Sequence, residues 1–167
     1  MVSVARNLGC CDFSGAHVGT QKVPDLAFLV ENDQGLPEVK FVVEVGLAET
    51  YSDLTVDAKL WLEGMETVSL VLLVKLEESP AYHCPIKGLS DEEFSNLRFP
   101  NLTEIKKEPF TLGGPYGPAI YKDFTWMGEI SGFLELWKID PVTESATPGP
   151  RIVSHSSRDV RYLSLPI

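Results

Sequence analysis

The 167-residue sequence predicts a mixed α/β (α+β) fold, in which a central sheet is flanked by helices. Three observations predict it: two apolar runs separated by a turn-rich stretch, one amphipathic stretch with helical spacing, and a further unbroken apolar run. The length allows one domain with a substantial core but is short for two. We therefore expect a single domain over residues 1–167, with its core in 23–77.

The two apolar runs predict a β-hairpin over residues 23–30 and 39–46. A proline at the second position of "VPDLAFLV" suits the beginning of a strand. The intervening "ENDQGLPE" contains the Asn, Asp and Gly residues typical of a turn. Before the hairpin, residues 1–22 carry weak signals, and "CDFSGAHVGTQK" indicates a loop because it is rich in glycine and small polar residues.

A helix is predicted over residues 51–64, with Thr50 or Ser52 as its N-cap and Asp53 in its first turn. Gly64 suits the C-terminal end. Apolar residues recur at helical spacing and give the helix one apolar face: Leu54, Ala58, Trp61, Leu62 and Met65. This helix is expected to pack across the sheet.

A third strand is predicted over residues 68–78, where the unbroken run 70–74 indicates burial on both faces. Residues 79–128 are less regular: Ser90 begins a capping-box pattern that predicts a short helix, whereas 111–124 contain too many glycines and prolines for regular structure. The C-terminal region 130–167 is expected to add strands. Its predicted elements are a strand over 130–140, a connection over 141–151 and a short edge strand over 161–167.

Composition and charge limit the function classes. The formal net charge is −10, which argues against a non-specific duplex-DNA binder, because such proteins present a basic stripe. No apolar run reaches the roughly 18 residues of a membrane-spanning helix, and no secretory signal is evident, so we expect an intracellular protein without a membrane partner. Cys10, Cys11 and Cys84 form neither a disulfide framework nor a CxxC zinc motif, which favours reduced thiols.

The most informative residue is Glu44, which interrupts the apolar run from Phe41 to Val45. Burying an isolated carboxylate costs several kcal/mol or more, so Glu44 needs a partner, a metal or a proton. The structural alternatives are an ion pair with Lys75 or Lys59, or a hydrogen bond to a loop amide. Glu135 repeats the pattern in "FLELW", where strand alternation would make it part of a polar face.

Three residues occur in a meaningful order: Asp25 after Pro24 at the first strand, Glu44 in the second strand, and Lys59 in the following helix. This order resembles the PD-(D/E)XK nuclease superfamily, in particular the branch whose lysine has migrated from the strand to the helix. The sequence pattern of "FVVEVGLAETYSDLTVDAKLWLEG" also resembles that of a group of uncharacterised fungal restriction-endonuclease-like proteins. The resemblance covers residues 23–77.

The resemblance implies a restriction-endonuclease-like mixed sheet and metal-dependent hydrolysis of a phosphodiester, with nucleic acid as substrate. It implies Mg²⁺, or Mn²⁺ in its place, as cofactor, with Asp25 and Glu44 as metal ligands and Lys59 as the cationic helper. The sequence departs from the usual pattern at Gly46, where the superfamily has a lysine. The alternative is a catalytically inactive nuclease-fold protein that binds a protein or another ligand.

Overall fold

The computed structural model describes residues 2–5, 11–99 and 110–154. The chain forms two compact units. Unit 1 comprises the residues up to Leu76 and those from Gly132 to Val153, and unit 2 lies between Glu77 and Ser131. The predicted α+β class is confirmed, since a six-stranded mixed sheet is combined with helices.

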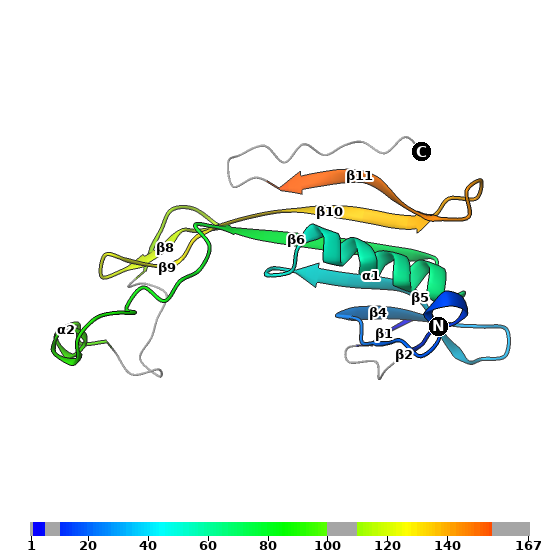
Figure 1. The fold of residues 1–167 in the computed structure, drawn as a ribbon, viewed down its shortest axis with the longest axis horizontal. Coiled ribbons are helices and arrows are strands. Elements are labelled where there is room, and N and C mark those ends of the chain that lie inside the picture. The colour runs from blue at the N-terminus through cyan, green and yellow to red at the C-terminus, as the bar shows by residue number, and fades with distance from the viewer. Residues whose placement is uncertain (1, 6–10, 100–109, 155–167) are drawn as a thin grey trace. The chain divides into compact units, whose positions relative to one another are not determined.

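The large sheet has the strand order β1-β4-β5-β6-β10-β11 (Figure 1). Its strands are β1 (Val2–Ala5), β4 (Leu26–Glu31), β5 (Pro37–Gly46), β6 (Leu70–Ser79), β10 (Glu129–Ile139) and β11 (Ala146–Ser154). A separate two-stranded sheet joins β2 (Cys11–Asp12) to β3 (Gln21–Lys22), and the short 3₁₀ helix η1 (Gly15–His17) lies between them in the chain.

The middle of the sheet is a hairpin followed by a crossover. β4 pairs with β5 in antiparallel register, and β5 pairs with β6 in parallel register, with Glu44 opposite Leu73. Two parallel neighbours require a long connection that returns the chain to the same edge, and an α-helix is the usual solution. Here that connection is α1 (Tyr51–Gly64), which lies along one face of the sheet (Figure 1).

The helix α1 begins where its sequence indicates. The Thr50 side chain accepts a hydrogen bond from the Asp53 amide, and the Asp53 carboxylate accepts one from the Thr50 amide, which completes a capping box. The apolar face of the helix packs into the main core of unit 1. The fully buried larger side chains of that core are Trp61, Leu54, Leu73, Val42 and Val71.

The N-terminal residues 11–22, predicted as a loop, contain β2, η1 and β3, and both strands are only two residues long. Burial of 70–74 on both faces is wrong, because Leu70 is 36% exposed and only alternate residues of β6 are fully buried. Residues 141–151, predicted as a connection, contain the first part of β11, which pairs at the edge of the sheet. The strand predicted over 161–167 lies outside the described residues.

Unit 2 contains the helix α2 (Asp91–Asn96), whose capping box from Ser90 is confirmed. The expectation that residues 111–124 lack regular structure is wrong. A three-stranded antiparallel sheet forms from β7 (Thr111–Leu112), β8 (Ala119–Tyr121) and β9 (Phe124–Met127). Its strands are short because glycines and prolines surround them. Neither α1 nor α2, the α-helices of the described ranges, is long and apolar enough to cross a membrane.

Candidate functional site

Glu44 is buried on the face of β5 that α1 covers, with only 4% of its surface exposed. The indole Nε1–H of Trp61, on α1, donates a hydrogen bond of 2.5 Å to its Oε1. The carboxylate therefore has a partner, as the cost of burial requires. That partner comes from the core-facing side of the helix.

The cation beside Glu44 is Lys22, which neither the residue pattern nor the superfamily resemblance indicated. Its Nζ lies 3.8 Å from Glu44 Oε2 and 2.8 Å from Asp57 Oδ2. Lys22 ends β3, whereas Asp57 projects from α1. One ammonium group thus joins a strand carboxylate to a helix carboxylate.

Contacts far apart in the sequence hold Lys22 in this place. Phe13 is buried, and its ring lies 5.0 Å from the Trp61 ring, centroid to centroid. The Ser14 amide donates to the Gly64 carbonyl over 2.7 Å, at the end of α1. A side chain at Gly64 would collide with Phe13, since its Cβ would lie 2.9 Å from that ring. These contacts anchor the segment that leads into β3.

Asp25 lies immediately before β4, whose first residue Leu26 pairs with Val43. Its Oδ2 accepts a 2.7 Å hydrogen bond from the Val45 amide, so its carboxylate sits beside the stretch of β5 that carries Glu44. The side chain is exposed, in contrast to Glu44. The negative charge of Asp25 also contributes to raising the pKa of Glu44.

Lys59 lies on an exposed part of α1, and none of the ion pairs described for Glu44 comes from it. The strand position that carries lysine in the superfamily pattern is closed here, because a Cβ on Gly46 would lie 2.8 Å from Leu54 Cδ1. A lysine at that position would therefore require the buried Leu54 side chain to move. The positive charge beside Glu44 belongs to Lys22, in the N-terminal segment.

We call Lys22, Asp25, Glu44, Asp57 and Trp61 the Glu44 site. Burial raises the pKa of Glu44 to about 7, against the opposing effects of Lys22 and the Trp61 hydrogen bond. The charges of Asp25 and Asp57 raise it further. Burial lowers the pKa of Lys22, but its hydrogen bond to Asp57 and the surrounding carboxylates outweigh this effect and raise the pKa overall.

The raised pKa of Glu44 predicts that the free energy of unfolding depends on pH. Because its folded-state pKa of about 7 exceeds the ordinary value of 4.5, the folded protein binds this proton more tightly than the unfolded chain does. The free energy of unfolding should therefore fall as pH rises from 4.5 through 7, by on the order of 2–3 kcal/mol from this group. Glu44→Gln should abolish that part of the fall in urea denaturation at pH 5 and pH 8, in EDTA.

The exposed carboxylate of Glu66 supplies the control. Glu66→Gln makes the same change of charge, so it corrects for the general effect of net charge on stability. An equal pH dependence in both variants would show that Glu44 does not titrate in this range.

A second buried carboxylate, Glu135 on β10, is 5% exposed and belongs to a separate cluster. Its Oε2 accepts hydrogen bonds from the Tyr51 hydroxyl at 2.5 Å and from Trp137 Nε1 at 2.9 Å. Arg151 Nη2 lies 3.4 Å from Glu135 Oε1. The guanidinium carbon of Arg151 also lies 3.7 Å from the centroid of the Phe133 ring. The predicted polar face is wrong, because this carboxylate faces the core and is fully partnered.

Lys75 is 7% exposed, and its ammonium group donates to two backbone carbonyls, Leu47 O at 3.1 Å and Leu76 O at 2.7 Å. Its described contacts are thus with the backbone, and the predicted alternative of a Glu44–Lys75 pair is not formed. Lys75 instead ties β6 to the loop that follows β5.

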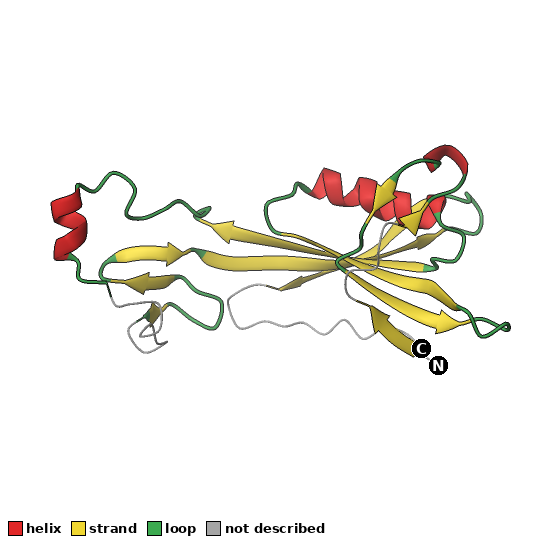
Figure 2. Ribbon diagram, turned by 90° about the horizontal axis from the view of Figure 1, so that it is seen from below, coloured by secondary structure: helices red, strands yellow, loops and turns green. Residues whose placement is uncertain are grey.

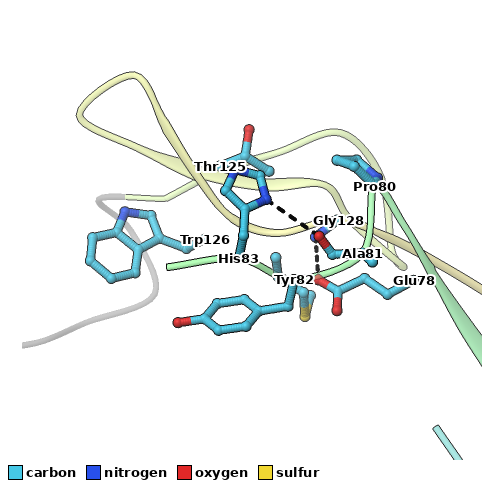
Figure 3. Close-up of a pocket in the computed structure, with 9 residues that line it drawn as sticks. Glu78, Pro80, Ala81, Tyr82, His83, Thr125, Trp126 and Gly128 are labelled. Carbon is cyan, nitrogen blue, oxygen red and sulfur yellow. Dashed lines mark hydrogen bonds between the residues drawn. The ribbon is translucent and has the colours of Figure 1, made fainter. Parts of the chain in front are cut away.

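Unit 2 contains a small open notch with a volume of about 10 Å³, roughly enough for one water molecule (Figure 3). Its lining includes the side chains of Tyr82, His83 and Trp126, and the Glu78 carboxylate accepts a 2.7 Å hydrogen bond from the Gly128 amide. The described residues that line it include no lysine, arginine or cysteine.

A divalent cation at the Glu44 site would have to be held by carboxylate oxygens. One oxygen of Asp25 accepts the Val45 amide and one oxygen of Glu44 accepts the Trp61 indole, and the second oxygen of Glu44 lies 3.8 Å from Lys22 Nζ. Such hydrogen bonds orient metal-binding carboxylates in proteins. Among the described residues, no group of three or more His, Cys, Asp or Glu side chains could hold a metal ion. The described residues therefore offer at most two carboxylates, and a Mg²⁺ ion held by them would have to complete its shell with water and substrate.

Comparison of the chain with protein-family models, curated proteins and solved structures finds no match.

Proposed function

We propose that the protein is a metal-dependent phosphodiester hydrolase of the PD-(D/E)XK type, with its reaction centre at the Glu44 site. The observation that carries the proposal is the convergence of Asp25, Glu44 and Lys22 at one end of the central hairpin. Two hard oxygen donors and one ammonium group are the set that this chemistry requires.

In this proposal Asp25 and Glu44 hold a Mg²⁺ or Mn²⁺ ion. Such an ion, when bound, lowers the pKa of a coordinated water and neutralises charge on a phosphate. Lys22 stabilises the negative charge that develops on the phosphate, which replaces the role first predicted for Lys59. Asp57 fixes the Lys22 ammonium group at 2.8 Å, and Trp61 fixes the Glu44 carboxylate.

The test is cleavage of single- and double-stranded DNA and RNA in a titration of Mg²⁺ and Mn²⁺. We expect cleavage that depends on the cation and falls at least about 100-fold in Glu44→Gln. Glu66→Gln should cleave like the unaltered protein. No cleavage of any of these substrates with either cation would overturn the proposal.

One observation favours a second candidate, a nuclease-fold protein without activity that binds a protein or another ligand. Lys22 already forms ion pairs with both Glu44 and Asp57, so the carboxylates are compensated without a metal ion. This candidate is supported if Mn²⁺ does not bind, cleavage is absent and a stoichiometric partner is recovered while Glu44→Gln folds normally.

A further inference from the structure

The charged groups of the Glu44 site come from separate elements of unit 1. Figure 2 shows α1 and η1 on the same side of the large sheet. The chain continues from η1 into β3, where Lys22 reaches Asp57 of α1 and Glu44 of β5. The N-terminal segment, the strand and the helix thus bring their charges together on this side of the sheet.

Carboxylates outnumber cations at the Glu44 site. Lys22 Nζ lies 2.8 Å from Asp57 Oδ2 and 3.8 Å from Glu44 Oε2, and the negative charge of the exposed Glu49 also acts on it. The negative charge of Asp25 acts on Glu44. Four carboxylates and one ammonium group give a formal charge of −3, and a bound divalent cation would leave −1.

Three other cations in the described part of unit 1 have partners of their own. Lys40 pairs with Glu38 at 2.8 Å, and Arg151 pairs with the buried Glu135. Lys75 is buried and donates to two backbone carbonyls. The described contacts of these cations therefore hold their charges away from the Glu44 site.

The exposed cations Lys59 and Lys138 leave their elements on other sides. Lys59 follows Asp57 by two residues, which is about 200° around the helix, so it does not point where Asp57 points. Lys138 follows Trp137, which is buried in the core, so by strand alternation it projects from the opposite face of the sheet. Among the described residues of unit 1, Lys22 is thus the cation that lies at the site.

A long nucleic-acid strand requires more positive charge than this. Proteins that hold a polymeric nucleic acid line a groove with lysine and arginine, and each phosphate contact neutralises one negative charge. Duplex DNA makes the requirement higher, because it carries one charge per roughly 1.7 Å of its axis. At the Glu44 site, a bound divalent cation and Lys22 could together neutralise one phosphodiester, and each further phosphate would meet an excess of carboxylates.

We propose that the substrates of the Glu44 site are short single-stranded oligonucleotides, which the site engages through a single phosphodiester. This inference rests on the proposed hydrolase function and names its substrate class. A strand held through one phosphodiester is cleaved, per bond, at a rate that does not depend on its length. Duplexes are poor substrates, because their denser phosphates approach the same carboxylates.

Steady-state cleavage by the full chain in Mn²⁺ tests the proposal with a thymidine dinucleotide, a long single strand and a duplex of the same length. We expect kcat/KM per phosphodiester to agree within about threefold for the dinucleotide and the single strand, and to be at least about tenfold lower for the duplex. The logarithm of kcat/KM should fall against the logarithm of salt concentration with a slope of about −0.7, the value for one phosphate of a single strand. A slope steeper than about −1.4, the value for two phosphates, would overturn the proposal.

Binding without the cation gives a readout that does not depend on cleavage. In EDTA and low salt, fluorescence anisotropy should show no binding of the labelled long single strand or duplex by protein at up to about 10 μM. Saturable binding of either in this range would overturn the proposal. Absence of cleavage of every substrate would overturn the proposed function together with this inference, whereas a steep salt dependence of cleavage would overturn this inference alone.

A reversal of charge beside Lys22 tests the same point. Glu49→Lys adds one cation for a second phosphate, so it should speed cleavage of the long single strand roughly fivefold at about 0.1 M salt and leave the dinucleotide unchanged. Glu66→Lys makes the same change at another exposed position and should alter neither rate. Equal acceleration of both substrates by Glu49→Lys would contradict engagement through a single phosphodiester.

Discussion

Lys22→Met should reduce metal-dependent cleavage at least about 100-fold, whereas Lys59→Met should change it no more than about threefold. Lys22 lies 3.8 Å from the buried Glu44 carboxylate and is fixed by Asp57, whereas Lys59 is exposed on α1. Both changes remove one positive charge, so a loss that depended only on net charge would be equal in the two variants. Initial rates at saturating Mg²⁺ provide the measurement.

Stability must be separated from activity in this comparison, because Lys22→Met also leaves two carboxylates without their cation. Lys22→Arg keeps the charge and should restore part of the rate, and circular dichroism should show that all three variants fold. If Lys59→Met were the inactive variant, or if both retained full activity, the role that we give to Lys22 would be wrong.

Glu135→Ala should lower the free energy of unfolding by about 3 kcal/mol, since it leaves the donors of Tyr51, Trp137 and Arg151 without their acceptor. Arg151 is partly exposed and can be rehydrated, but Trp137 is 4% exposed and cannot. Glu135→Gln keeps one acceptor oxygen and should lose about half as much. Urea denaturation followed by tryptophan fluorescence measures both values.

Lys138→Ala, at an exposed position of the same strand, serves as the control and should change stability by less than about 0.5 kcal/mol. A loss below 1 kcal/mol in Glu135→Ala, on the order of an ordinary exposed hydrogen bond, would show that the cluster reorganises or admits water. A normal rate of cleavage in Glu135→Gln is also expected, because this cluster is separate from the Glu44 site.

The sequence predicted the central elements well because their local signals agree with their long-range packing. For residues 51–64 the capping box, the apolar face and the terminal glycine all indicate the same helix. The structure has α1 at these residues. The hairpin was recognisable from two apolar runs and a turn. In the hairpin, the apolar neighbours of Glu44 are enough to predict a buried carboxylate, but they do not indicate its partner.

The identity of that partner could not be predicted. Lys22 belongs to a strand of two residues, which has no periodicity, and its place depends on Phe13 and Ser14 contacting the end of α1. Such contacts join residues about 50 positions apart. Phe13 is a single apolar residue in a stretch that predicts a loop, and no neighbouring residue indicates that it packs on Trp61.

Two further differences have the same origin. Strand alternation predicts that Glu135 lies on a polar face, but Tyr51 and Arg151 from distant elements provide its partners. The uniformly apolar sequence of β6 predicts burial on both faces, but Leu70 is exposed and its neighbours on the same face are only partly buried. Apolar composition alone does not distinguish a fully buried face from a partly exposed one.

The most direct test of the Glu44 site is the anomalous difference density of crystals grown or soaked with Mn²⁺. We expect one peak per chain, within about 2.0–2.6 Å of one carboxylate oxygen from Asp25 and one from Glu44, with Lys22 beside it. Both carboxylates engaged only by protein groups, with Lys22 Nζ between them and no peak at saturating Mn²⁺, would contradict the metal-dependent mechanism.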